Sequence, residues 1–137
     1  MKILIGIDPG VKTGLAYLFD GELNRVFTSD IIKVMSDVEN VVYHAENKGH
    51  TLKLYIEDAR KRKWVTGGRE KLQGVGSVKR DCAIWETFCQ HHGIDYELVA
   101  PKNNKTKLND KDFRRLTGWT ERTNEHGRDA AMLVFGR

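Results

Sequence analysis

Four side chains that are far apart in the sequence could together hold a divalent cation. Asp8 and Glu57 each follow a short apolar segment, and His126 and Asp129 lie three residues apart in a later segment. Carboxylates held close together repel one another, so such a group needs a proton or a cation between its members. Ligands of this kind favour Mg²⁺, with Mn²⁺ as a substitute. One or two such ions would activate water for phosphodiester hydrolysis, so the residue types indicate a metal-dependent hydrolase.

Each of these residues also has an ordinary structural interpretation. An acid before Pro9-Gly10 is a common turn former, and Asp58, directly after Glu57, is predicted to cap a turn or lie in a loop. A helical pair such as His126 and Asp129 is often found on a solvated face. Their combination beside a strongly basic loop is much less expected by chance, and it favours the metal site.

Positive charge is concentrated between residues 60 and 80. This segment has eight basic residues and one acid, a net charge of +7, whereas the whole chain carries +4 and the remainder therefore −3. Glycines and Trp64 are interleaved with the bases, a combination that suits a nucleic-acid backbone with bases nearby. A solvated charged face is the alternative, and Trp64 could equally cover an apolar patch. The predicted DNA-binding residues are Arg60, Lys61, Arg62, Lys63, Trp64, Arg69, Lys71, Ser77, Lys79, Arg80, Lys102, Lys105 and Lys107.

The elements that must position these residues follow from the hydrophobic periodicity. Strands are predicted over 2–7, 13–19, 23–29, 52–56 and 96–99, and helices over 35–47, 77–92, 110–116 and from 125 onward. Three strands in succession and then strands separated by helices predict an α/β fold. Its mixed five-stranded sheet has three antiparallel strands first, then parallel strands, with helices on the faces. If the first and fourth strands are parallel neighbours, Asp8 and Glu57 emerge at the same edge.

The helix predicted over 77–92 carries an apolar stripe that includes Cys82, Trp85 and Cys89, which is most simply core. Ile84 and Phe88 widen this surface, so part of it is a candidate dimer interface. Ser77 would lie just before the helix, whose N-terminus could hold a DNA phosphate.

Bulk properties limit the possible classes of protein. The 137 residues predict one domain, 1–137, and 39% hydrophobic with 31% charged residues is typical of a globular chain. No apolar run reaches the ~20 residues of a membrane span, and the N-terminus lacks a signal-peptide pattern. Two cysteines with neither metal-clip nor disulfide-framework spacing favour a reducing cytoplasm.

Three motifs in this order, GIDPGVKTGLA, LYIEDAR and HGRDAAML, resemble the RuvC family of Holliday junction resolvases in the RNase H-like superfamily. The resemblance implies an RNase H-like fold and a homodimer that makes two symmetric nicks in a four-way DNA junction with Mg²⁺. Asp8, Glu57 and Asp129 match the first, second and last acids of the family, and His126 falls where members have aspartate or histidine. The family also carries lysines near the matching loop, so the resemblance implies Lys102 and Lys107 as DNA contacts.

The chain is shorter than typical bacterial members and resembles compact bacteriophage-encoded relatives, whose substrate range can be broader. This implies location in the host cytoplasm. Two other functions compete with a branched-DNA endonuclease. A phosphotransferase or ATP-binding protein of the actin-like superfamily also has an Asp-x-Gly loop after its first strand, but it needs two domains. A DNA-binding module that has lost catalysis is disfavoured by the intact acids.

Overall fold

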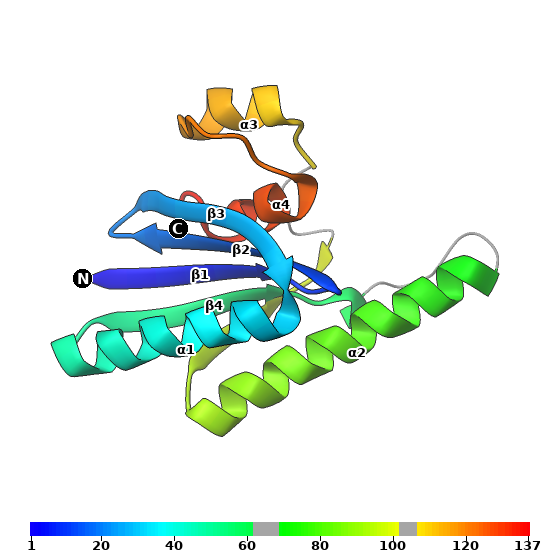
Figure 1. Ribbon diagram of the computed structural model, residues 1–137, viewed down its shortest axis with the longest axis horizontal. Helices are drawn as coiled ribbons and strands as arrows, with labels where there is room; N and C mark the ends of the chain where they lie inside the picture. The colour runs from blue at the N-terminus through cyan, green and yellow to red at the C-terminus, as the bar shows by residue number, and fades with distance from the viewer. Residues whose placement is uncertain (62–68, 102–106) are drawn as a thin grey trace.

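The computed structural model describes residues 1–61, 69–101 and 107–137 (Figure 1). The elements in chain order are β1 (Lys2–Asp8), β2 (Lys12–Phe19), β3 (Glu22–Asp30), α1 (Ile31–Lys48), β4 (Thr51–Glu57), the 3₁₀ turn η1 (Ala59–Lys61), α2 (Arg69–His92), β5 (Asp95–Val99), α3 (Asp110–Thr117) and α4 (Glu125–Val134). The sheet order is β3-β2-β1-β4-β5. Pairing is antiparallel between β1 and β2 and between β2 and β3, and parallel between β1 and β4 and between β4 and β5. The predicted mixed five-stranded sheet is confirmed.

The turn between β2 and β3 is formed by Asp20 and Gly21, whose φ angles are 49° and 88°. Positive φ at both central residues is the requirement of a type I′ turn, whose twist matches that of the strands it joins. The tight hairpin follows directly from the Asp-Gly dipeptide.

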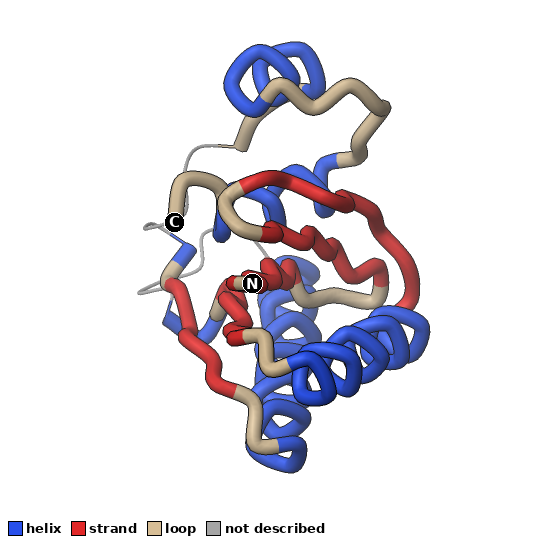
Figure 2. The backbone as a smooth tube through the Cα atoms, turned by 90° about the vertical axis from the view of Figure 1, so that its left-hand side faces the viewer, coloured by secondary structure: helices blue, strands red, loops and turns tan. Residues whose placement is uncertain are grey.

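The sheet lies between two layers of helices. Figure 1 shows α1 and α2 on one face and α4, with α3 beyond it, on the other, and the end-on view of Figure 2 shows the same arrangement. Alternate residues of β1 enter different cores: Ile3, Ile5 and Ile7 pack in the cluster on the α1–α2 face. Leu4 belongs to the cluster on the α4 face. Residues two apart on a strand point to the same side, so Asp8 faces α4.

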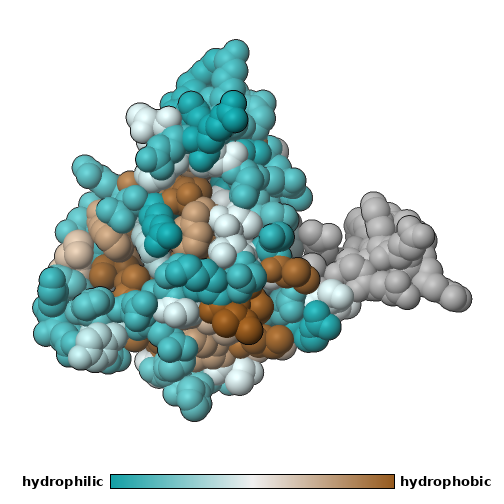
Figure 3. Space-filling view, in the orientation of Figure 1, coloured by the Kyte–Doolittle hydropathy of each residue, from teal (hydrophilic) through white to brown (hydrophobic). Residues whose placement is uncertain are grey.

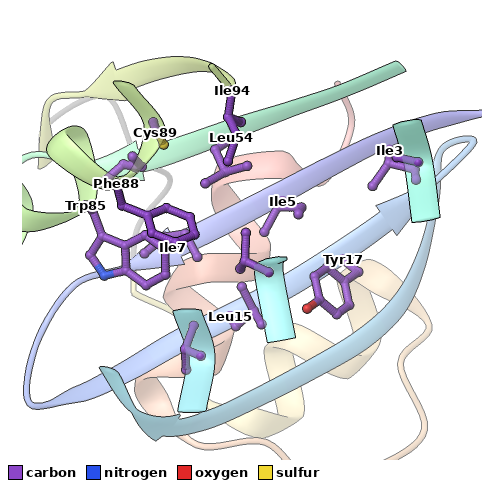
Figure 4. Packing of buried hydrophobic residues seen from close by; sticks show 14 residues of the cluster. Ile3, Ile5, Ile7, Leu15, Tyr17, Leu54, Trp85, Phe88, Cys89 and Ile94 are labelled. Atoms are coloured by element: carbon purple, nitrogen blue, oxygen red, sulfur yellow. The ribbon is translucent and has the colours of Figure 1, made fainter. Parts of the chain in front are cut away.

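Helix α2 supplies the aromatic part of the core on its own face of the sheet. Trp85 and Cys89 are fully buried, and Figure 4 shows their side chains in the same cluster as Phe88 and Ile94. The predicted core stripe is therefore confirmed. Phe88 is only 8% exposed and packs in this core, whereas Ile84 is exposed, so Ile84 is the part of the candidate dimer surface that stays accessible. The two cysteines are free and buried, which suits inert packing residues.

Helix α2 begins eight residues earlier than predicted, at Arg69. Ser77 therefore lies within the helix, and the prediction that it precedes a phosphate-binding N-terminus is wrong. Gly74 and Gly76 are also helical. A glycine costs a helix only about 1 kcal/mol, too little to end one that continues on both sides.

The surface seen in Figure 3 is mainly hydrophilic over α3, with apolar residues lower on the same face, where α1 covers the sheet. The most exposed large apolar side chains are Ile32 in α1 and Val11 between β1 and β2. Among the described helices, none is both long and apolar enough to cross a membrane.

Candidate active site

Strands β1 and β4 bring two carboxylates together at their carboxyl ends. The parallel register pairs Ile7 with Ile56, so the next residues along the two strands, Asp8 and Glu57, are neighbours. Tyr55, two residues before Glu57, belongs to the cluster on the α4 face, so Glu57 points to the same side as Asp8. This is the edge at which open α/β sheets commonly bind ligands.

Helix α4 comes unusually close to the sheet because two strand glycines face it. A Cβ atom on Gly14 would lie 1.9 Å from the carbonyl oxygen of His126, and one on Gly6 would lie 2.0 Å from that of Ala130. The first turn of α4 is capped by Asn124, whose side chain accepts a hydrogen bond from the Gly127 amide at 2.9 Å. This docking carries the helical residues 126 and 129 to the ends of β1 and β4.

The four predicted ligands come together in one pocket of about 140 Å³. It is lined by Asp8, Pro9, Glu57, Ala59, Lys107, His126 and Asp129. His126 Nδ1 lies 3.1 Å from Asp8 Oδ2, and Asp129 is buried. Lys107 forms an ion pair with Glu125 at 3.1 Å beside this pocket. The pocket therefore combines three carboxylates with an imidazole and an ammonium group.

The electrostatics of the pocket favour added positive charge. Burial, and after it the charge of Glu57, raises the pKa of the Asp8 carboxyl to about 7. Burial is also the main cause of a raised pKa at Asp129. Ionising these carboxyl groups together is costly without a counter-charge, and a divalent cation bound by their hard oxygens would supply it. Within residues 1–61, 69–101 and 107–137, however, no three His, Cys, Asp or Glu side chains are already positioned to hold one ion. Ion binding would require their side chains to rotate.

The raised pKa of Asp8 predicts how stability depends on pH in metal-free protein. The ordinary pKa of this carboxyl is 3.8, so between about pH 4 and 7 the folded state keeps a proton that the unfolded state has released. Its contribution to the free energy of unfolding therefore falls as pH rises through this window and levels off above it. Asp8→Asn cannot ionise, and at pH 8 with EDTA we expect it to be more stable than wild type by on the order of 2 kcal/mol.

Thermal and denaturant unfolding of both proteins at pH 4 and pH 8 measures this difference. Near pH 4 the two should be nearly equal. Adding Mg²⁺ or Mn²⁺ at pH 8 should stabilise wild type more than Asp8→Asn. Equal stability of the two proteins at both pH values would contradict a raised pKa of Asp8 in the folded state.

The predicted DNA-binding residues are distributed unevenly. Lys79 and Arg80 are exposed on α2, and Ser77 is half-buried there. Lys61 lies in η1, and Arg69 and Lys71 lie in the first turn of α2. Lys107 lines the pocket, whereas the sequence predicted it only as a DNA contact. Five others, Arg62, Lys63, Trp64, Lys102 and Lys105, lie outside the described residues.

Among the bases whose side chains the structure describes, Arg60 has a guanidinium that is held by two acids. Nε and Nη2 donate to the two oxygens of Asp58 at 2.8 and 3.1 Å, and Nη2 also donates to Glu86 Oε1 at 3.1 Å. The Asp58 side chain is 4% exposed and accepts from the Arg60 amide, so it caps η1 as predicted. Sequence reasoning missed this pairing, for which the Asp-x-Arg spacing was the only signal.

No protein-family model and no curated protein matches the sequence. Solved structures do match. Thermus thermophilus RuvC in complex with a Holliday junction substrate is 15% identical, with a TM-score of 0.58 over 98% of this chain and 91% of that chain. A second Thermus thermophilus RuvC structure is 15% identical, with a TM-score of 0.60 over 97% of this chain and 91% of that one. This chain has the RuvC fold. The RNase H-like architecture expected from the three motifs is thereby confirmed.

Proposed function

We propose that this protein is a metal-dependent endonuclease that nicks four-way DNA junctions and other branched DNA. The observation that carries the proposal is the pocket in which Asp8, Glu57, His126 and Asp129 meet on a RuvC fold. These are the residues that the three sequence motifs single out, and they converge although the first and last are more than a hundred residues apart. The Thermus thermophilus protein with this fold was solved with a Holliday junction substrate, which suggests the class of DNA.

The chain's own groups have separable roles in this proposal. Asp8, Glu57 and Asp129, with His126, would hold one or two Mg²⁺ or Mn²⁺ ions, which would supply an activated water and stabilise the leaving oxygen. Lys107, at the pocket wall, offers a cation to the scissile phosphate. Lys79 and Arg80 on the exposed side of α2 offer phosphate contacts that are independent of sequence. Paired nicks in a two-fold symmetric junction need two such pockets, so we propose that the active form is a homodimer.

Incubation with a panel of synthetic DNAs tests this function. Four-way, three-way, flap and linear duplex substrates are compared with Mg²⁺, Mn²⁺ or EDTA, with strand-specific labels to map the nicks. We expect nicks at symmetric positions in the four-way junction, weaker cleavage of the other branched forms, and none with EDTA. Binding of junctions without cleavage under any metal condition would favour a DNA-binding module. Cleavage of linear duplex at the same rate as the four-way junction would show that the enzyme does not select for DNA structure.

His126 has two possible roles that substitution separates. As a ligand, its neutral imidazole suits Mn²⁺ better than Mg²⁺; as a protonated group, it would stabilise the charge of the phosphate. Both roles predict a large rate loss for His126→Ala. We expect His126→Asp, which keeps a ligand in the form of a hard oxygen, to retain cleavage, with Mg²⁺ serving at least as well relative to Mn²⁺ as in wild type.

Single-turnover cleavage of a four-way junction with each metal, measured across pH, provides the comparison. If His126→Asp is as inactive as His126→Ala, and a pH dependence of the wild-type rate is missing from His126→Ala, the imidazole acts through its proton. A wild-type rate for His126→Ala would reduce the site to its three acids.

A further inference from the structure

We propose that Arg60 is a positioning residue that holds Glu57 at the active site and is not one of the bases that bind DNA phosphates. The inference rests on the nuclease function proposed above. It separates Arg60 from the run of positive charge to which it belongs in the sequence. The two roles make opposite predictions for DNA affinity and for cleavage.

The backbone around Glu57 is held on both sides of the sheet edge. The carbonyl of Glu57 accepts a hydrogen bond from the Cys82 thiol at 3.2 Å, which ties it to α2. The amide of Asp58 donates to the carbonyl of Val99 at 2.8 Å, which ties it to the end of β5. The chain therefore leaves β4 in one defined direction, and Asp58 is the first residue after Glu57, the last residue of the strand.

Arg60 completes this hold because it neutralises Asp58. The Asp58 carboxylate is almost wholly removed from water, and its oxygens accept three hydrogen bonds from Arg60, one of them from the Arg60 amide. Arg60 in turn bonds to Glu86 of α2, and Glu86 also accepts from the Tyr96 hydroxyl at 3.1 Å. The bonds to Asp58 and Glu86 raise the pKa of the Arg60 guanidinium. One side chain thus connects the turn after Glu57 to both α2 and β5.

A guanidinium held in this way is less available to a phosphate than an exposed one. Nε and Nη2 are engaged by Asp58 and Glu86, and the Arg60 side chain is 32% exposed, against 64% for Arg80. Recruiting Arg60 to DNA would leave Asp58 as a buried carboxylate without its cation, which is strongly unfavourable. Arg80, whose contact with Asp81 is longer at 3.5 Å, is the better phosphate ligand.

The test compares Arg60→Lys with Arg60→Ala, Glu86→Gln and Arg80→Ala. Lysine keeps the charge but lacks the flat, two-pronged geometry that pairs with a carboxylate, so it preserves a phosphate contact and not the hold on Asp58. Arg60→Lys also leaves a cation beside Asp58, which protects folding if the alanine variant is unstable. Lys33→Ala, which removes a remote cation from an α1 ion pair, is the matched control.

Two quantities are measured for each folded variant. Junction affinity is determined with EDTA over a range of salt concentrations, and the cleavage rate is determined in single turnover with saturating protein. We expect Arg60→Lys and Arg60→Ala to cleave at least about tenfold more slowly, because small misplacements of a catalytic group are costly. Their affinity and salt dependence should equal those of wild type and Lys33→Ala. Glu86→Gln should slow cleavage without weakening binding.

Arg80→Ala supplies the contrast in binding. Loss of one phosphate contact should reduce the slope of log K against log salt by about 0.9. The same reduction in Arg60→Ala, or a wild-type cleavage rate in Arg60→Lys, would overturn the positioning role while leaving the nuclease proposal intact. Inactivity of the wild-type chain on every branched DNA would instead overturn the proposed function, and the positioning role with it.

Discussion

Asp8→Asn, Glu57→Gln and Asp129→Asn are each expected to reduce cleavage of a four-way junction by on the order of a thousandfold or more. The three carboxylates line one pocket, and burial is the main cause of the raised pKa values of Asp8 and Asp129. Each substitution removes a negative charge that would bind a divalent cation. Junction affinity should stay the same or increase, since the substitutions remove negative charge near a polyanion. Single-turnover cleavage and a binding titration with EDTA measure the two effects separately.

Glu39→Gln is the matched control, because this exposed carboxylate lies on α1, away from the pocket. It should leave cleavage and binding unchanged. Near-normal cleavage by any one of the three variants would remove that residue from the site. A parallel loss of binding and cleavage would show that the carboxylate supports folding, and circular dichroism would identify that case.

Gly14→Ala and Gly6→Ala are expected to destabilise the protein by on the order of 3 kcal/mol and to abolish cleavage. Each new methyl group would meet a backbone carbonyl of α4 at about 2 Å, and backbone atoms cannot rotate away as a flexible side chain can. Overpacking of a core usually costs about 1–3 kcal/mol, and contacts between main chains belong at the upper end. Displacement of α4 would also carry His126 and Asp129 away from the strand ends.

Gly76→Ala is expected to give the opposite result. It lies inside α2, where an added Cβ would meet no atom of the described residues within 4 Å beyond its own stretch of helix, so alanine should stabilise the helix by about 0.5–1 kcal/mol. Chemical denaturation of the three variants measures these differences. If Gly14→Ala were as stable as wild type, the close docking of α4 would be incorrect.

The parts of the fold that follow from local sequence could be predicted. The short apolar runs of β1 and β4 placed Asp8 and Glu57 at the ends of strands, and the Asp20-Gly21 turn identified the hairpin. The close approach of α4 could not be predicted, because glycine in a strand is consistent with a bulge, a bend or a packed neighbour. Gly6 and Gly14 are explained only once the helix above them is known.

The predictions of the start of α2 and of the role of Arg60 failed for different reasons. The helix predicted from residue 77 begins at Arg69 and includes Gly74 and Gly76, because the intrinsic cost of a glycine is small against continued helical bonding. Arg60 belongs to a dense run of bases, and charge counting treats every base alike. Its partner Glu86 is 26 residues away on another element, so only the three-dimensional structure separates a paired guanidinium from an exposed one.

The hydrogen-bonded pair of His126 and Asp8 joins residues 118 positions apart. Closing a loop of that length has an entropic cost that no local contact can offset, so the pocket cannot form before the sheet and α4 have assembled. Folding intermediates that contain only the hairpin, or only the parallel strands, would therefore lack this pocket. For the nuclease proposed above, DNA cleavage would then begin only once the native structure is complete.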